Sequence, residues 1–114
     1  MMGALIIPLI IAISAWLPRA HSAYVGTALT FSITLDRDRT AITIRYPREG
    51  TSHRICVHTE RQQRPELVTT CWNPRGPQEH IRLADTTLSV AGELHHENEE
   101  GRMSVLTTPP IRIR

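Results

Sequence analysis

Residues 29–46 alternate between apolar and polar positions in two runs. The first run places Leu29, Phe31, Ile33 and Leu35 on one side, and the second places Ile42, Ile44 and Tyr46 on one side. A period of two with β-branched residues is typical of half-buried strands, and the polar residues 36–39 between the runs indicate a turn. We therefore expect a β-hairpin. Pairing Leu35 with Thr40 sets Ile33 opposite Ile42, Phe31 opposite Ile44 and Leu29 opposite Tyr46, which collects every apolar side chain on one face.

A second alternating pair follows the turn at residues 47–50. His53–Glu60 and Leu67–Asn73 flank a loop at Arg61–Glu66. Pairing Glu60 with Leu67 sets Cys56 directly opposite Cys71, at a separation that a disulfide can bridge. This register puts the cysteines on the face opposite Ile55 and Val57. We therefore predict a cross-strand disulfide at the surface, outside the main core.

The rest of the chain continues the alternation of apolar and polar residues. Ile81 and Leu83 indicate a short strand, Leu88 to Leu94 a longer one, and Met103 to Thr107 its return after the loop His95–Arg102. Pro109 and Pro110 interrupt the pairing before a last alternating segment, Ile111–Arg114. The predicted fold is an all-β sandwich of about seven or eight strands, immunoglobulin-like or fibronectin-III-like, with a small β-barrel as the alternative.

No family is assigned by these patterns. Residues 47–57 resemble the turn and strand that end many fibronectin type III domains, but here they lie near the beginning of the predicted domain. The tryptophan of a true immunoglobulin domain lies between its two cysteines, whereas Trp72 follows the second cysteine. The resemblance therefore extends to architecture alone.

The first 22 residues have the character of an export leader. Residues 4–17 are continuously apolar apart from Ser14, a length typical of a signal-peptide core and short for a membrane span. Ala20 and Ser22 supply small residues before a cleavage site, so we expect residues 1–22 to be a signal peptide and 23–114 a single all-β domain. The segment before the apolar run carries no basic side chain, so an uncleaved anchor is the alternative.

Composition narrows the range of partners. The formal net charge is +2, and all 13 basic residues are arginines. Arginine suits bidentate contacts with carboxylates, although a GC-rich genome produces the same bias. Basic and acidic residues are interspersed along the chain without a basic stripe, so no nucleic-acid partner is expected. A membrane is expected as a partner only if the leader is retained.

Two features carry candidate chemistry. The cysteine pair has a structural interpretation, a bond closing a short loop in an exported domain, and a redox interpretation. The second feature is the histidine-rich acidic loop, where imidazole and carboxylate groups suit a transition metal. Its spacing matches no metal motif and adjacent strand residues point apart, so a solvated turn is the preferred interpretation. The metal candidates are His95, His96, Glu97 and Glu99, with His53, His58 and His80 as further ligands if the fold brings them close.

We expect a non-enzymatic binding module that engages another protein outside the cytoplasm, in secreted or periplasmic form. No catalytic motif is present, and no cofactor is expected. The C-terminal strand Ile111, Arg112, Ile113 and Arg114 is the predicted partner-binding edge, because an exposed strand can pair with a strand of another chain. The alternative function is a small extracytoplasmic metal-binding or redox protein that uses the His95–Arg102 loop or the Cys56–Cys71 pair. A structural subunit of a larger assembly is a third interpretation.

Overall fold

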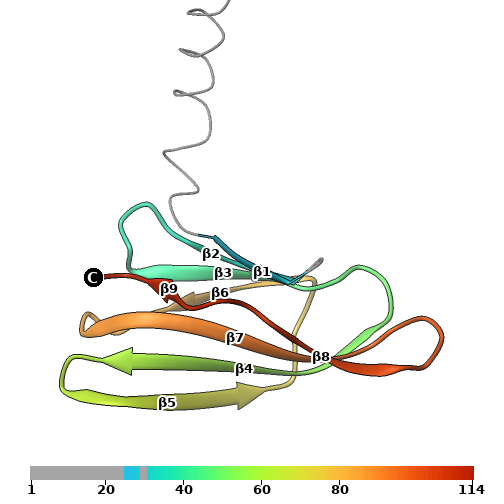
Figure 1. Ribbon diagram of the computed structural model, residues 1–114. Helices are drawn as coiled ribbons and strands as arrows, with labels where there is room; N and C mark the ends of the chain where they lie inside the picture. Colours follow the sequence, from blue (N-terminus) through green and yellow to red (C-terminus); the bar gives the residue numbers. More distant parts are fainter. Residues whose placement is uncertain (1–24, 29–30) are drawn as a thin grey trace, which may run out of the picture.

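The computed structural model describes residues 25–28 and 31–114, which form nine strands in two antiparallel sheets (Figure 1). The predicted leader lies outside the described residues. Sheet A has the order β1-β2-β3-β6, and sheet B has the order β5-β4-β7, with β8 and β9 both paired to β7. The strands are β1 (Val25–Ala28), β2 (Phe31–Leu35), β3 (Ala41–Arg45), β4 (Thr51–Arg61), β5 (Arg64–Trp72), β6 (Gln78–Arg82), β7 (Thr87–Glu97), β8 (Met103–Thr107) and β9 (Ile111–Arg112).

The strand order confirms the predicted sandwich. Strands β2, β3 and β6 occupy the A, B and E positions of an immunoglobulin-like fold, and β4, β7 and β8 occupy the C, F and G positions. β5 lies beside β4 in sheet B, where variable-type domains carry their C′ strand. The two sheets remain separate, which distinguishes this arrangement from the β-barrel alternative. None of the described residues forms a helix, so none provides a helical membrane span.

The first hairpin differs from its predicted register by two residues. Leu35 pairs with Ile42 instead of Thr40, and Ile33 pairs with Ile44. The turn takes up Thr40, whose backbone N–H and hydroxyl both donate to the Asp38 carboxylate at 3.3 and 2.9 Å. These bonds hold the pKa of Asp38 below its usual value. A shift of two preserves the face of every side chain, so the apolar residues still point inward.

The second hairpin has the predicted register. Cys56 is paired with Cys71 and Glu60 with Leu67. The strands run further than expected, so that β4 ends at Arg61 and β5 begins at Arg64, with a bulge beside the turn. β4 also pairs with β7 along almost its whole length, which makes it an interior strand of sheet B.

The core lies between the sheets and comes mainly from β2, β3, β4 and β7. Gly92 on β7 permits their close approach, because a Cβ there would lie 2.4 Å from Cδ1 of Ile33 and 3.0 Å from Cζ of Phe31. A larger residue would push β7 away from β2. The buried cluster comprises Phe31, Ile33, Leu35, Ile42, Ile44, Tyr46, Ile55, Val57, Val90, Leu94, Ile111 and Ile113.

The predicted loop at His95–Arg102 is shorter in the structure. His95, His96 and Glu97 are the last three residues of β7, and only residues 98–102 form the turn to β8. Ladder bonds with β4 and β8 continue through these histidines, which explains why a polar sequence remains a strand. Their side chains are consequently directed by the pleat of β7, to alternate faces of sheet B.

Candidate functional site on the outer face of sheet B

We call the surface of sheet B that points away from sheet A its outer face. The pairing registers define it, because directly paired residues in adjacent strands project to the same side. This face contains the disulfide, the histidines His58 and His95, and the exposed large hydrophobic side chains discussed below. Its members are Thr51, Arg54, Cys56, His58 and Glu60 on β4, Leu67, Thr69 and Cys71 on β5, Ser89, Ala91, Glu93, His95 and Glu97 on β7, Met103, Val105 and Thr107 on β8, and Arg112 on β9.

A disulfide joins Cys56 and Cys71 across β4 and β5, with 4.1 Å between their Cα atoms. The bond lies on the outer face and outside the buried apolar cluster, as the sequence predicts. However, Cys56 is only 4% exposed and Cys71 is half-buried, so the bond is less accessible than a surface position implies. Limited access favours the structural interpretation over thiol–disulfide exchange, which requires a path for the attacking thiolate.

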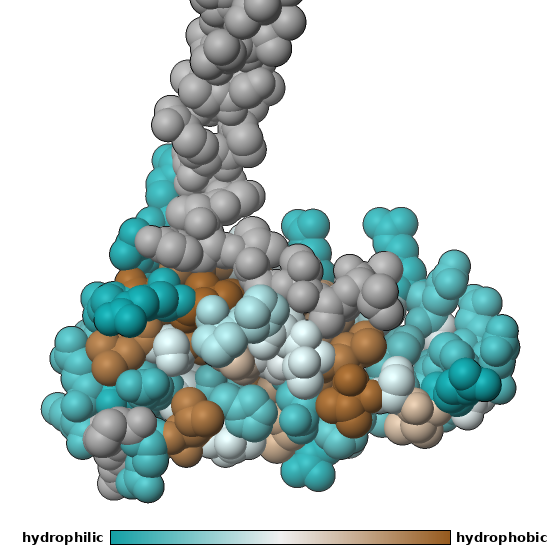
Figure 2. Space-filling view, viewed as in Figure 1, coloured by the Kyte–Doolittle hydropathy of each residue, from teal (hydrophilic) through white to brown (hydrophobic). Residues whose placement is uncertain are grey.

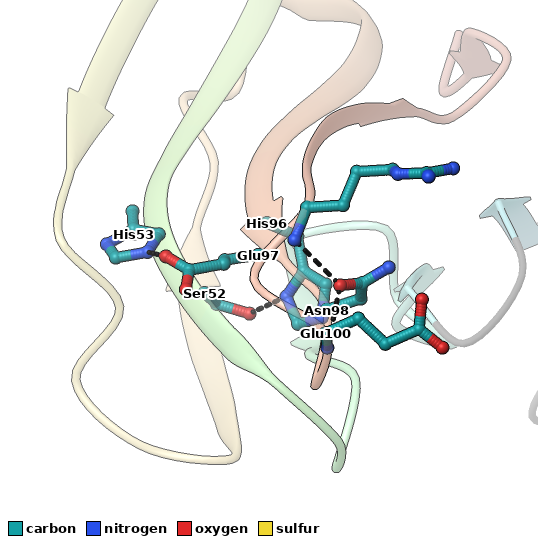
Figure 3. Close-up of polar contacts among 7 residues, drawn as sticks. Ser52, His53, His96, Glu97, Asn98 and Glu100 are labelled. Carbon is teal, nitrogen blue, oxygen red and sulfur yellow. Dashed lines mark hydrogen bonds and ion pairs between the residues drawn. The ribbon is translucent and has the colours of Figure 1, made fainter.

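The histidines of the predicted metal candidate have separate partners. His95 contacts Glu93 at 3.3 Å and His53 contacts Glu97 at 3.0 Å, both on the outer face. His96 lies on the other side of the sheet, where its Nδ1 is 3.0 Å from the Ser52 hydroxyl. Figure 3 shows His53 and His96 on the two sides of β4. Among the described residues no group of three or more His, Cys, Asp or Glu side chains is arranged to hold a metal ion.

The remaining candidates lie apart from this region. His58 is hydrogen-bonded to Thr69 at 2.7 Å, toward the other end of β4, and His80 contacts Asp36 on sheet A at 3.0 Å. Glu99 is exposed in the turn after β7. The fold therefore does not bring together the histidines that the metal hypothesis would need.

The turn after β7 is built around Asn98. Its Oδ1 accepts hydrogen bonds from the backbone N–H groups of Glu100 and Arg102, at 3.0 and 2.8 Å (Figure 3). Gly101 has a φ of 83°, a conformation that a residue with a Cβ rarely adopts. The turn thus has a defined shape, and its two acidic side chains, Glu99 and Glu100, are exposed to solvent.

A cleft of about 830 Å³ lies where the β3–β4 connection meets this turn. Residues of both charges line the cleft. The basic ones are Arg45 and Arg48, and the acidic ones are Glu49, Glu99 and Glu100. Buried His96 also lines the cleft, and its ring is already engaged with Ser52. A serine–histidine contact alone lacks the third orienting group and the oxyanion donors of a hydrolase site. The cleft is a recess of mixed polarity, lined by charged and apolar residues together.

Three large hydrophobic side chains are exposed among the described residues, and all of them lie on the outer face of sheet B. Leu67 is 63% exposed, Met103 is 54% exposed and Val105 is 53% exposed. Met103 and Val105 are neighbours along one side of β8, opposite Glu97 and His95 of β7. In the view of Figure 2, hydrophobic residues occur as separate spots among hydrophilic ones. Such a surface is suited to a mixed interface in which apolar anchors are surrounded by polar contacts.

Sequence reasoning used Met103 and Val105 only to locate a strand, and it missed their exposure. The side chains of both residues point to solvent, whereas Leu106 between Val105 and Thr107 packs against the core. The signal is available in principle, because the short turn at 98–102 pairs Met103 with Glu97, and Glu97 is out of phase with buried Leu94. The register of that turn therefore decides which side of β8 faces outward.

The predicted C-terminal edge is anchored in the core. Ile111 is 4% exposed and Ile113 is 1% exposed, while Arg112 and Arg114 are exposed. The backbone N–H of Ile113 donates to the Leu88 carbonyl at 2.8 Å, and its carbonyl accepts from the Arg39 guanidinium at 3.0 Å. The segment thus closes the sandwich on one side and presents arginines on the other.

A polar cluster that the sequence did not indicate joins the two sheets. The Tyr46 hydroxyl donates to Glu79 on β6, and the Trp72 indole N–H on β5 donates to the same carboxylate at 3.0 and 3.2 Å. Burial raises the pKa of Tyr46 above its ordinary value, and the hydrogen bond to the Glu79 carboxylate adds to the effect. The cluster holds the end of β5 against sheet A.

Comparisons with protein-family models, with curated proteins and with solved structures find no match to this chain.

Proposed function

We propose that this protein is an exported, non-enzymatic binding module that engages another protein outside the cytoplasm through the outer face of sheet B. The observation that carries the proposal is the exposure of Met103 and Val105, side by side on a paired strand. The backbone of a paired strand is already ordered, so burying these side chains costs only their own rotamer freedom and yields more net affinity than burying the same residues on a loop.

The surroundings of these two residues favour a specific contact. Glu97 and His95 lie directly opposite Met103 and Val105, and each belongs to a carboxylate–histidine pair. Interfaces commonly combine a few apolar anchors with a polar rim, and the rim sets orientation and partner choice. The exposed side of the predicted C-terminal edge extends this surface, because Arg112 of β9 is paired with Ser89 on the same face.

An extracytoplasmic compartment suits this chain best. A disulfide is most stable in an oxidising environment, and no free cysteine is present among the described residues. Together with the predicted leader at residues 1–22, this supports a secreted or periplasmic location. The partner is then a protein encountered in that same compartment.

The proposal is tested by photo-crosslinking in the exporting cell. A photoreactive amino acid at position 105 is expected to give a discrete adduct with one other protein, identified by mass spectrometry. The control position is Thr43, which lies between buried Ile42 and Ile44 on the opposite, outer side of sheet A. The same adducts from both positions, or none from position 105, would contradict the proposal.

Affinity for the identified partner provides the quantitative test. The double variant Met103→Lys/Val105→Lys is expected to weaken binding by at least about tenfold, because it replaces apolar anchors with charges that must be desolvated. Thr43→Lys adds one like charge on the other sheet and should change binding less than about twofold. Calorimetric titration of the purified proteins measures both.

A further inference from the structure

The outer edge of β5 is an open strand of unusual composition. β5 spans nine residues and pairs with β4 on one side, and no described strand pairs with its other side. Residues 67–72 read Leu-Val-Thr-Thr-Cys-Trp, without charge, proline or glycine. Natural edge strands are normally protected from pairing by such residues or by bulges and coverings. This edge lacks those protections in its central part.

The register shows which backbone groups are available. In an antiparallel pair, closely spaced residues about 4.5 Å apart alternate with hydrogen-bonded residues about 5.5 Å apart. The Cα atoms of Cys56 and Cys71 are 4.1 Å apart, so this is a non-hydrogen-bonded pair. The N–H and C=O groups of Cys71 therefore point away from β4. By alternation, those of Thr69 and Leu67 do the same.

Both faces of this strand are accessible beside the open edge. Leu67 and Thr69 are exposed on the outer face, and Glu66 and Thr70 are exposed on the inner face. In Figure 1, β5 is the outermost strand at the lower margin of sheet B. A neighbouring strand could thus join the ladder without displacing any described element.

We propose that this edge pairs antiparallel with β5 of a second copy of the chain, about a two-fold axis at Thr69. Thr69 then lies opposite the partner's Thr69, Leu67 opposite the partner's Cys71, and Val68 opposite the partner's Thr70. Threonine pairs and apolar pairs are favourable cross-strand neighbours. The same patch serves both copies, as an isologous interface requires, and sheet B becomes one continuous sheet through the dimer.

The charges of β5 are compatible with a second copy in the antiparallel direction. Arg64 and Glu66 are its only charged residues, and both lie at its beginning. Antiparallel pairing about Thr69 sets Glu66 opposite the partner's Trp72. Neither Arg64 nor Glu66 then lies opposite the same residue of the other chain. A symmetric parallel pairing, which must be in register, would bring each charge beside the same charge of the other copy, which is unfavourable. A second copy therefore fits the edge in one orientation.

Sedimentation velocity over a concentration series tests the dimer directly, using the oxidised protein. The wild type is expected to shift from monomer to dimer, and Thr69→Val should behave in the same way because its backbone and shape are kept. Thr69→Lys places two like charges at the axis and should raise the dimer dissociation constant by at least about tenfold. Thr43→Lys, the same charge on sheet A, should leave it unchanged. A wild type that remains monomeric throughout would overturn the proposal.

Amide exchange measured by NMR gives a second readout that does not depend on a variant folding. The amides of Leu67, Thr69 and Cys71 should exchange more slowly at high than at low protein concentration. Those of Val68 and Thr70, already bonded to β4, should not respond. Protection of the first three amides by a different protein, with no response to concentration, would refute the second copy as occupant. Neither readout involves Met103 or Val105, so the result is independent of the proposed function.

Discussion

The two edges of sheet B differ in composition and in how they are attached. The β8–β9 edge is broken by Pro109 and Pro110, and Thr108 fills the break, where its hydroxyl accepts the Gly92 N–H at 2.8 Å and its N–H donates to the Gly92 carbonyl at 2.9 Å. Beyond the break, Ile111 and Ile113 enter the core. This edge combines a proline interruption with apolar anchoring.

The β5 edge has the opposite character. It is continuous, it contributes no member to the buried cluster, and Trp72 is the side chain that packs against the cluster. A disulfide and the polar cluster at Glu79 hold it instead. The comparison teaches that one edge of the sheet is attached through apolar side chains in the core, whereas the other is attached through covalent and polar links.

Ile113→Ala should have the largest effect, because it removes a buried side chain from the anchored edge. The expected loss is about 2–5 kcal/mol in the free energy of unfolding, measured by urea denaturation. Leu67→Ala removes a comparable side chain from the exposed edge, and the expected loss is less than about 0.5 kcal/mol. Equal losses for the two variants would remove the distinction between the edges.

Removing the disulfide tests the covalent attachment of β5. Cys56→Ala with Cys71→Ala should cost about 2–4 kcal/mol of unfolding free energy, because the open chain gains entropy when the loop is no longer closed. A matched control is His58→Ala with Thr69→Ala, the next non-hydrogen-bonded pair of the same strands, which should cost about 1 kcal/mol or less. Similar costs would show that the bond adds nothing beyond an ordinary cross-strand contact.

Tyr46→Phe tests the polar attachment and should have the smallest effect, about 0.5–1.5 kcal/mol near neutral pH from the lost hydrogen bond to Glu79. The folded state raises the pKa of Tyr46, so its contribution is present at pH values below that of the unfolded phenol, about 10. Above about pH 10 the unfolded chain ionises first, and stability falls as the pH rises. Urea denaturation at pH 8 and pH 11 should show a smaller decrease for the variant than for the wild type. Identical decreases would exclude Tyr46 as the source.

The sequence pattern was sufficient to predict a strand register where a single feature, the cysteine pair, constrained both strands. The cysteines and the flanking alternation specify the β4–β5 register together, and the structure has it. In the first hairpin, alternation alone leaves registers that differ by two equally satisfied, since each keeps the apolar face intact. The bonds of Thr40 to Asp38 within the turn selected the observed one. Turn chemistry, rather than hydrophobicity, made that choice.

The candidate site was harder to predict from the sequence, because it depends on where the strands end and how they pair. His95 and His96 are adjacent in the chain, yet the strand extends through them and sends them to opposite faces of sheet B, with Glu93 and Ser52 as partners. The exposure of Met103 and Val105 depends on a sheet pairing that ends in a particular turn. Residues that are adjacent in the sequence can act together in a loop. On a strand, adjacent side chains point to opposite faces and are therefore separated.

By itself the sequence determined the all-β class, the alternating strands and the opposition of the two cysteines, because side-chain period and local pairing are short-range properties. Only the tertiary structure decided which edge of sheet B is anchored in the core and which is not. That outcome depends on how the two sheets stack: Ile111 and Ile113 meet the core because sheet A covers β9, whereas Leu67 projects from the outer face of sheet B, away from sheet A. Burial is set by neighbours distant in the chain, so no local pattern could have assigned it.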